Sequence, residues 1–330
     1  MNRVIRIGGF ILGATLLVFL VIHSGPAMLW RTITGSAWVV GPLVLIWGVV
    51  YACNARAWQL LIPDRPPEFT FLRAFLLTIS SFAMNFTTPA LSLGGEPLKM
   101  AGATPLLGRE RAVGSVVSFR FLHSVSHMVV LLSAIIPAAI LLPHTPAIWA
   151  MLGGATIFLA GATTFLLSSH RDGVFERGVS LLGRVWLLRA LVERLEKNRG
   201  RLQELDRELS AVHTAPGQFK WALATEVAGR IAGTLEFAVI LYGLGLGLDI
   251  PRAFVIANLG SVFTMLLFFM PFEMGAKEGG AYLIFAWLGL DPKLGTSAAL
   301  LSRVRELAWA VIGIGALLLM GPAKPRATSR

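Results

Sequence analysis

The sequence predicts an all-α, polytopic membrane protein, and three observations carry that prediction. Hydrophobic residues make up 55% of the chain of 330 and charged residues only 14%, with a mean hydropathy of +0.71. Several apolar runs approach or exceed the length of about 20 residues that a helix needs to cross a bilayer. No short segments of alternating hydrophobicity indicate a β-barrel, so helices must satisfy the backbone in lipid.

Six full spans are predicted, in chain order, at 5–23, 37–55, 112–142, 147–168, 219–247 and 296–320. A basic start precedes the first span and no cleavage motif follows it, so we interpret it as a retained span, not a signal peptide. Two further apolar segments, 71–88 and 254–270, each lead into a proline, a glycine motif, an acid and a shorter apolar segment. We expect re-entrant helical hairpins over 71–106 and 254–292, with pairs of short spans as the alternative.

The basic residues predict the orientation of these spans. The net charge is +11, and most of the excess lies in short segments between apolar runs. With the N-terminus inside and both hairpins returning to their side of entry, only Arg31, Arg252 and Lys293 face outward. The positive-inside rule favours this topology. We therefore expect a multi-pass protein of the cell inner membrane, with both termini in the cytoplasm, and no nucleic-acid partner.

The segment 170–213 differs from the rest of the chain because apolar residues recur in it at helical spacing, with Arg and Glu between them. It predicts a cytoplasmic amphipathic helical insert within a single transmembrane domain that spans residues 1–330. Such an insert would hold anionic headgroups through its basic face, and a regulatory partner is the alternative.

A repeated motif marks the two hairpins. The stretch "PALSLGGE" runs from Pro89 to Glu96, and "PFEMGAKE" runs from Pro271 to Glu278. Proline and glycine interrupt both stretches, and each has a lysine near its acid. Arg120 follows Glu96 by 24 residues, and Arg303 follows Glu278 by 25. The pattern predicts an inverted-topology repeat, with one half at about 37–142 and the other at about 219–320.

Physical chemistry explains why these residue types occur at a break. Proline removes a backbone donor, and glycine permits a tight turn or a close approach of two backbones. The predicted break residues are Pro89, Gly94, Gly95, Pro271 and Gly275. Broken backbone at membrane depth is tolerated only where it is buried in protein or lines a wet cavity. A charge there costs at least about 2.5–3.5 kcal/mol, so it is paired or faces water.

These motifs resemble the transmembrane region of lysylphosphatidylglycerol synthases and related stand-alone, flippase-like membrane proteins. The resemblance covers roughly residues 5–320 and rests on the order of Pro89, Gly95, Glu96 and Lys99, then of Pro271, Gly275, Glu278 and Arg303. Two features depart from the family pattern: Phe119 stands where a glutamate often precedes the arginine, and "FEMGAKE" replaces a glycine-rich run. We expect no aminoacyl-transferase domain after Met320, so the resemblance does not imply lysyl-lipid synthesis.

The resemblance implies a lipid flippase that moves an anionic or amine-bearing lipid between leaflets through a polar cavity near the midplane. The expected substrate-binding residues are Glu96, Lys99, Arg120, Lys277, Glu278, Arg303, Arg305 and Glu306. The cations would hold a phosphate, and the glutamates would hold the cations or accept an amine. Membrane lipids are the expected partners, together with lipid-modifying enzymes at the inner surface.

Three alternatives to a flippase stay open. A scaffold or accessory protein of envelope lipid synthesis, such as hopanoid synthesis, would act through the insert. An ion-coupled solute carrier would use titration of Glu96 and Glu278. An integral-membrane enzyme would need a carboxylate cluster for Mg²⁺, and the aspartates are scattered, so we expect no enzyme activity. We expect no cofactor, since the sequence has no phosphate-binding loop for ATP.

The remaining polar residues are expected to have structural roles. The i,i+4 spacing of Glu226 and Arg230 favours a local, structural ion pair. His123 and His127 share one helical face without the glutamate of a zinc motif, so we expect polar packing and no metal. Cys53 is the one cysteine, which excludes an intrachain disulfide.

Overall fold

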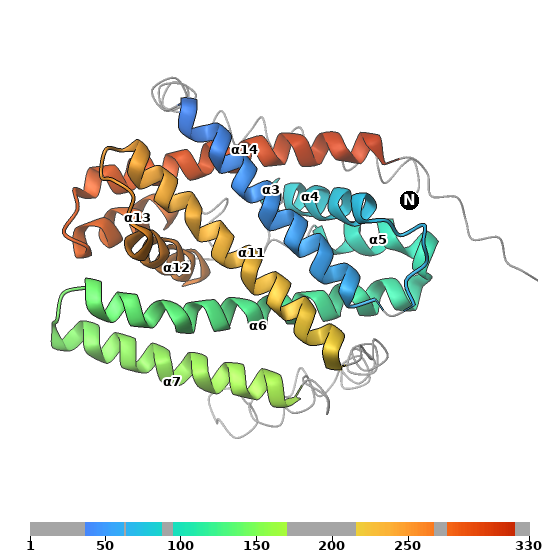
Figure 1. Ribbon diagram of the computed structural model, residues 1–330, viewed down its shortest axis with the longest axis horizontal. Helices are drawn as coiled ribbons and strands as arrows, with labels where there is room; N and C mark the ends of the chain where they lie inside the picture. Colours follow the sequence, from blue (N-terminus) through green and yellow to red (C-terminus); the bar gives the residue numbers. More distant parts are fainter. Residues whose placement is uncertain (1–36, 63, 88–94, 170–215, 267–275, 321–330) are drawn as a thin grey trace, which may run out of the picture.

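A computed structural model describes residues 37–62, 64–87, 95–169, 216–266 and 276–320. The described residues form these helices: α3 Ala37–Leu60, α4 Phe71–Thr87, α5 Gly95–Leu107, α6 Arg109–Leu141, α7 Pro146–Ser169, α11 Pro216–Gly243, α12 Ile250–Leu266, α13 Ala276–Trp287 and α14 Pro292–Leu319. The described part of the chain contains no strand, as an all-α membrane protein requires (Figure 1). The predicted span 5–23 and insert 170–213 lie outside the described residues.

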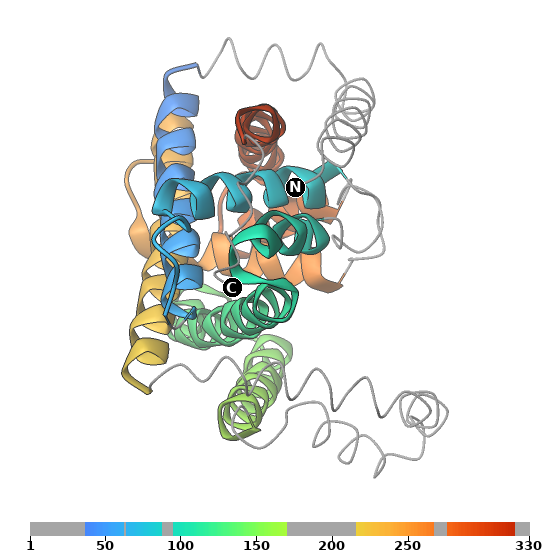
Figure 2. The same ribbon diagram turned by 90° about the vertical axis from the view of Figure 1, so that its right-hand side faces the viewer.

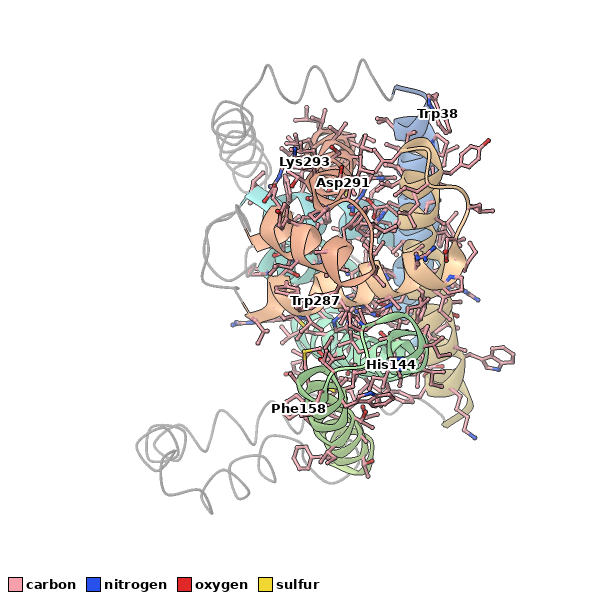
Figure 3. All side chains as sticks on the ribbon, turned by 90° about the vertical axis from the view of Figure 1, so that its left-hand side faces the viewer. Trp38, His144, Phe158, Trp287, Asp291 and Lys293 are labelled. Carbon is pink, nitrogen blue, oxygen red and sulfur yellow. The ribbon has the colours of Figure 1, made fainter. Side chains whose placement is uncertain are left out.

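The predicted spans correspond to long helices. By length and composition, α3, α6 and α7 are able to cross a membrane. Helices α11 and α14 have 28 residues each, about 42 Å of helix, but several charged residues interrupt their apolar character. Large apolar side chains face outward, as in a protein whose surface meets lipid. Ile157 and Phe158 on α7 are 77% and 70% exposed, and Figure 3 shows Phe158 at the outer surface of that helix.

The two hairpins enter from opposite ends of the molecule. Helices α4 and α5 have 17 and 13 residues, and α12 and α13 have 17 and 12. Each is shorter than the roughly 20 residues that span a bilayer, which favours re-entrant hairpins over pairs of spans. In Figure 1 the α4–α5 hairpin lies at one end of the molecule and α12–α13 at the other. The Arg111 side chain donates to the Asp64 carbonyl (3.4 Å), so the first hairpin begins and ends at the same side.

Helices α3–α6 and α11–α14 correspond in order, in length and in their contacts. Helix α3 packs on α11, α4 packs on α14, and α12 packs on α6 (Figure 2). Each of these contacts joins a helix of one half to a helix of the other. A glycine with positive φ joins the short helix to the long one in both halves: Gly108 (81°) before α6 and Gly289 (70°) before α14. Such a φ favours glycine, since a Cβ would strain the turn.

Small residues let the central helices approach closely. A Cβ on Gly313 of α14 would meet the Ile79 carbonyl and the Ala83 Cβ of α4, and one on Gly229 of α11 would meet Cβ of Cys53 on α3 at 2.7 Å. Small residues at such crossings are typical of helix packing in membranes, where close backbone contact replaces the hydrophobic effect. Because these crossings hold α4 against α14 and α3 against α11, they bring side chains from both halves around one space between the halves.

Candidate functional site

A cavity of about 460 Å³ lies between the two halves. Side chains from all eight helices of the two halves line it, and α7 contributes none. Six of the eight residues predicted to bind substrate are in the lining: Glu96, Lys99, Arg120, Lys277, Arg305 and Glu306. The folded chain therefore gathers both hairpins and the long helices α6 and α14 around one polar space.

The acid of each hairpin pairs with the arginine that follows it. Arg120 Nη1 lies 3.2 Å from Glu96 Oε1, and Arg303 donates to Glu278 Oε1 at 2.6 Å from Nη2 and 3.0 Å from Nε. The two pairs differ in access. The Arg120 side chain is 53% exposed and lines the cavity, whereas Arg303 is 2% exposed and, like Glu278, is not in the lining.

Lys99 is buried beside the cavity without a carboxylate partner. Its residue is 5% exposed, and its Nζ lies 4.2 Å from the centre of the Phe119 ring and 4.8 Å from that of Trp58. Within the described residues it forms no ion pair. Three helices build this position, since Lys99 comes from α5, Trp58 from α3 and Phe119 from α6. The faces of aromatic rings stabilise an ammonium by up to about 2 kcal/mol when it is desolvated, but they do not neutralise it.

The cations of the second half are neutralised by neighbouring acids. Lys277 of α13 pairs with Glu306 of α14. Arg305 donates to both carboxylate oxygens of Glu236 on α11, at 2.9–3.1 Å, and lies 3.9 Å from the centre of the Trp47 ring. Trp47 Nε1 donates to the same carboxylate at 2.6 Å. Glu236 and Arg305 are both 3% exposed, so this is a buried and closed network.

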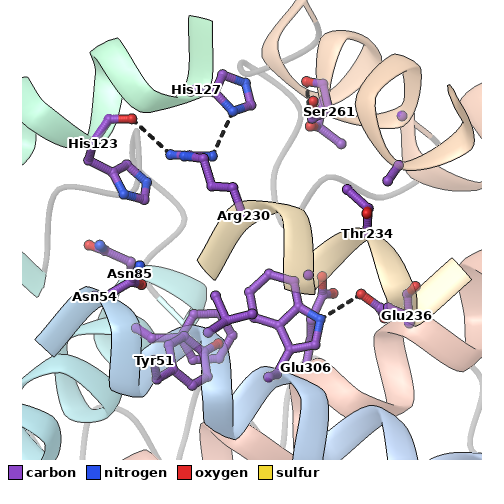
Figure 4. A pocket seen from close by; sticks show the side chains of 18 of the residues that line it. Tyr51, Asn54, Asn85, His123, His127, Arg230, Thr234, Glu236, Ser261 and Glu306 are labelled. Atoms are coloured by element: carbon purple, nitrogen blue, oxygen red, sulfur yellow. Dashed lines mark hydrogen bonds between the residues drawn. The ribbon is translucent and has the colours of Figure 1, made fainter. Parts of the chain in front are cut away.

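A further polar cluster contains residues that sequence reasoning set aside. Glu226 accepts from Asn54 and lies 2.5 Å from His123 Nδ1, while Arg230 donates to Ser126, to His127 and to the His123 carbonyl (Figure 4).

The predicted local pair of Glu226 with Arg230 is therefore wrong: both side chains bond to other helices. Their polar partners lie across the interface on α6 and α3, where a direct hydrogen bond replaces the weaker i,i+4 contact. The four-residue spacing of His123 and His127 was the available signal, since it places both rings on the face that meets α11.

The breaks themselves are described only in part. Pro89, Gly94, Pro271 and Gly275 lie outside the described residues. Gly95 is the first residue of α5, and its N–H donates to Asn85 Oδ1 at 2.7 Å. A Cβ at Gly95 would meet the Ser81 carbonyl and the Asn85 side chain, so this position requires the close approach that glycine permits. Glu96 and Glu278 both lie in the first turn of a short helix, where the helix dipole favours an acid.

Fold and site together define an integral membrane protein, all-helical, whose two halves enclose a charged cavity. The chain belongs to the family of the lysylphosphatidylglycerol synthase TM region, whose family model matches residues 6–315. No curated protein and no solved structure matches it.

Proposed function

We propose that the protein is a flippase that moves a lipid with an anionic or amine-bearing headgroup between the leaflets of the bacterial inner membrane. The headgroup would pass through the cavity between the halves while the acyl chains stay in lipid. The observation that carries the proposal is Lys99, a buried cation that faces this cavity and has no carboxylate partner among the described residues.

Electrostatics supports an anion at Lys99. An unpaired charge inside a membrane protein is costly, and such residues mark substrate or ion pathways. A phosphate beside Lys99 would supply the missing negative charge. Arg120 lines the same cavity with half of its side chain exposed, so it would donate to the same phosphate as a second cation.

Glu96 supports an amine on the headgroup. Its Oε1 pairs with Arg120, but its Oε2 is buried without a hydrogen-bond partner in the described part of the structure. A buried acceptor left unpaired costs about 1–3 kcal/mol, so a donor from the substrate would stabilise it. An ammonium near Glu96 and a phosphate near Lys99 would place a zwitterionic or amine-bearing phospholipid across the first half of the cavity.

The arrangement of the hairpins supports alternating access. Broken helices that enter from opposite sides toward a shared site are typical of transporters built from inverted repeats. Near the end of α3 and the starts of α4 and α6 lie Arg56, Arg65, Arg73, Arg109 and Arg111, whereas at the starts of α12 and α14 lie Arg252 and Lys293. The first group belongs to the end of the molecule that holds the α4–α5 hairpin, and the second to the end that holds α12–α13. By the positive-inside rule the first end would face the cytoplasm. The proposal contains no catalytic step.

The alternatives make different predictions. Family membership favours a lipid over a small solute as the cargo. A scaffold that recruits lipid-modifying enzymes would lose its function on deletion of residues 174–212, whereas a flippase would retain transport.

The proposal is tested with purified protein in vesicles that carry a trace of fluorescent phosphatidylglycerol. Bleaching of the outer leaflet by a reductant reports how fast the probe crosses. We expect Lys99→Gln to slow crossing by roughly 10- to 100-fold, because a charge-assisted bond of about 1.5–3 kcal/mol is lost. Lys293→Gln is the matched control, since Lys293 is exposed outside the cavity. Equal crossing in wild-type and protein-free vesicles would contradict the proposal.

A further inference from the structure

A fully buried carboxylate lies directly behind the cavity. Glu226 is 0% exposed on α11, at the crossing of α11 with α3 and α6, and it is not in the cavity lining. His123 of α6 stands between the two. It lines the cavity with 34% of its side chain exposed, and its Nδ1 lies 2.5 Å from Glu226 Oε1. The histidine therefore connects a sealed acid to the space that receives the headgroup.

Hydrogen bonding fixes which atoms hold protons. Asn54 Nδ2 donates to both oxygens of Glu226, at 3.0 and 2.9 Å, so the acid accepts as a carboxylate. The contact with His123 Nδ1 then holds one shared proton. The other ring nitrogen of His123, Nε2, bonds to no residue that the structure describes. His123 is thus able to bind a second proton there and to become an imidazolium beside the carboxylate.

The neighbouring histidine lacks this freedom. Arg230 Nη1 lies 2.7 Å from His127 Nδ1, and a guanidinium in a protein is always a donor. His127 Nδ1 must therefore accept, which keeps that nitrogen without a proton. Of the two histidines in this cluster, His123 is therefore the one with a ring nitrogen available to bind a further proton.

The surroundings decide when His123 takes up a proton. The ionisable groups that face the pair are Cys53 from α3, Lys99 from α5, Arg120 and His127 from α6, and Arg230 from α11. Helix α7 carries no ionisable side chain, and Arg252 of α12 pairs with Asp249. Glu96 of α5 pairs with Arg120 and partly offsets it, so Lys99 and Arg230 are the main positive charges that oppose another proton while no phosphate is bound. A phosphate beside Lys99 and Arg120 would offset them and favour the imidazolium.

We propose that His123 and Glu226 form a proton-binding site that is coupled to the anionic headgroup, so that a proton and the anion are bound and carried together. The inference rests on the proposed function for the identity of the cargo. The coupling is reciprocal: the anion raises proton occupancy at His123, and the proton strengthens anion binding by the same factor. The proton and the phosphate carry opposite charges, so binding both together adds no net charge to the cavity.

A binding experiment tests the coupling without requiring transport. Titration calorimetry of the detergent-solubilised protein with short-chain phosphatidylglycerol is run in two buffers that differ in ionisation enthalpy. The difference in heat gives the number of protons taken up per lipid bound. We expect net uptake near pH 7 and binding about tenfold tighter near pH 6 than near pH 8. Short-chain phosphatidylcholine serves as the zwitterionic comparison.

The variants assign the proton to the pair. Glu226→Gln keeps the shape of the acid, and His123→Asn keeps a donor for Glu226, but neither variant is able to form the charged pair. Proton uptake is expected to disappear in both and to persist in His144→Gln, which alters an exposed histidine between α6 and α7. Uptake that survives in both variants would overturn the inference, as would binding of the lipid without uptake, or no binding at any pH. A protein that shows uptake but no lipid crossing in vesicles would contradict the proposed flippase while leaving the proton site standing.

Discussion

The two halves of the molecule carry the same charged motif and use it differently. In both, an acid in the first turn of a short helix pairs with an arginine of the following long helix. Three residues after that arginine, the first half has His123 and the second has Glu306. Glu306 pairs with Lys277 in the second half. The matching position in the first half holds His123, so it offers Lys99 no carboxylate, and Lys99 contacts aromatic rings instead. The same motif is thus part of a closed ionic network in one half and lies beside a cation without a carboxylate partner in the other.

This contrast separates charges that hold the fold from charges that are available to a ligand. In the second half Arg305 and Glu236 are both 3% exposed and have several hydrogen bonds. In the first half Arg120 has half of its side chain exposed and a single acid beside it. Substitutions in the two halves should therefore damage different properties, and stability and lipid binding can be measured separately.

The largest expected effect is on stability, in the second half. Arg305→Ala leaves Glu236 buried without its cation, and breaking a buried ion pair costs about 3–5 kcal/mol. We expect a marked fall in the thermal unfolding midpoint, measured by size-exclusion chromatography of the heated, detergent-solubilised protein. Arg120→Ala is the matched variant in the first half, and it should cost less than about 1 kcal/mol because that pair is partly exposed. Equal destabilisation by the two variants would show that the charges of the two halves do not differ in their contribution to stability.

An intermediate effect is expected at Lys277. Lys277→Gln removes the nearest cation from Glu306, which is 14% exposed and keeps Arg305 Nη2 at 3.6 Å, and should destabilise the protein by roughly 2 kcal/mol, the cost of a charge-assisted hydrogen bond. The double variant Lys277→Gln with Glu306→Gln removes both charges and should recover much of that loss. The same unfolding assay measures both. A double variant no more stable than Lys277→Gln alone would show that the pair is not a closed unit.

The smallest expected effect is on binding, in the first half. Phe119 has its ring centre 4.2 Å from Lys99 Nζ, so Phe119→Glu would place a carboxylate beside this cation and give it the partner that it lacks. We expect binding of short-chain phosphatidylglycerol to weaken about tenfold, or about 1.4 kcal/mol, while the protein stays folded. Phe119→Leu controls for loss of the ring. Unchanged binding in the glutamate variant would show that Lys99 is not the anion site.

Sequence reasoning predicted the classes of element well. The predicted spans 37–55, 112–142 and 147–168 lie within or closely overlap α3, α6 and α7, and the two breaks fall between short helices at corresponding positions. These features follow from local properties: the length of an apolar run, a proline, a glycine or an acid at a helix start. A pairing of Glu96 with a nearby cation was also foreseeable, because in both motifs an acid is followed by an arginine at a similar spacing, 24 and 25 residues.

The partners of most charges were not foreseeable. Glu226 bonds to His123 and Asn54, which are 103 and 172 residues away, so no spacing rule brings them together. Lys277 lines the cavity, whereas Arg303 is buried outside the lining. This difference depends on which side of α13 and α14 faces the cavity. Helix spacing places a residue on a face, but only packing decides what that face meets.

The sequence by itself determined that the chain is an all-helical membrane protein with two interrupted hairpins and a charge at each break. It could do so because hydrophobic length and backbone chemistry act over a few turns of helix. Only the tertiary structure decided that Lys277 is paired and Lys99 is not, and that His123 joins a buried acid to the cavity. Ionic partners are fixed by the crossing of helices that are distant in the chain, and small residues such as Gly229 and Gly313 set how closely those helices approach.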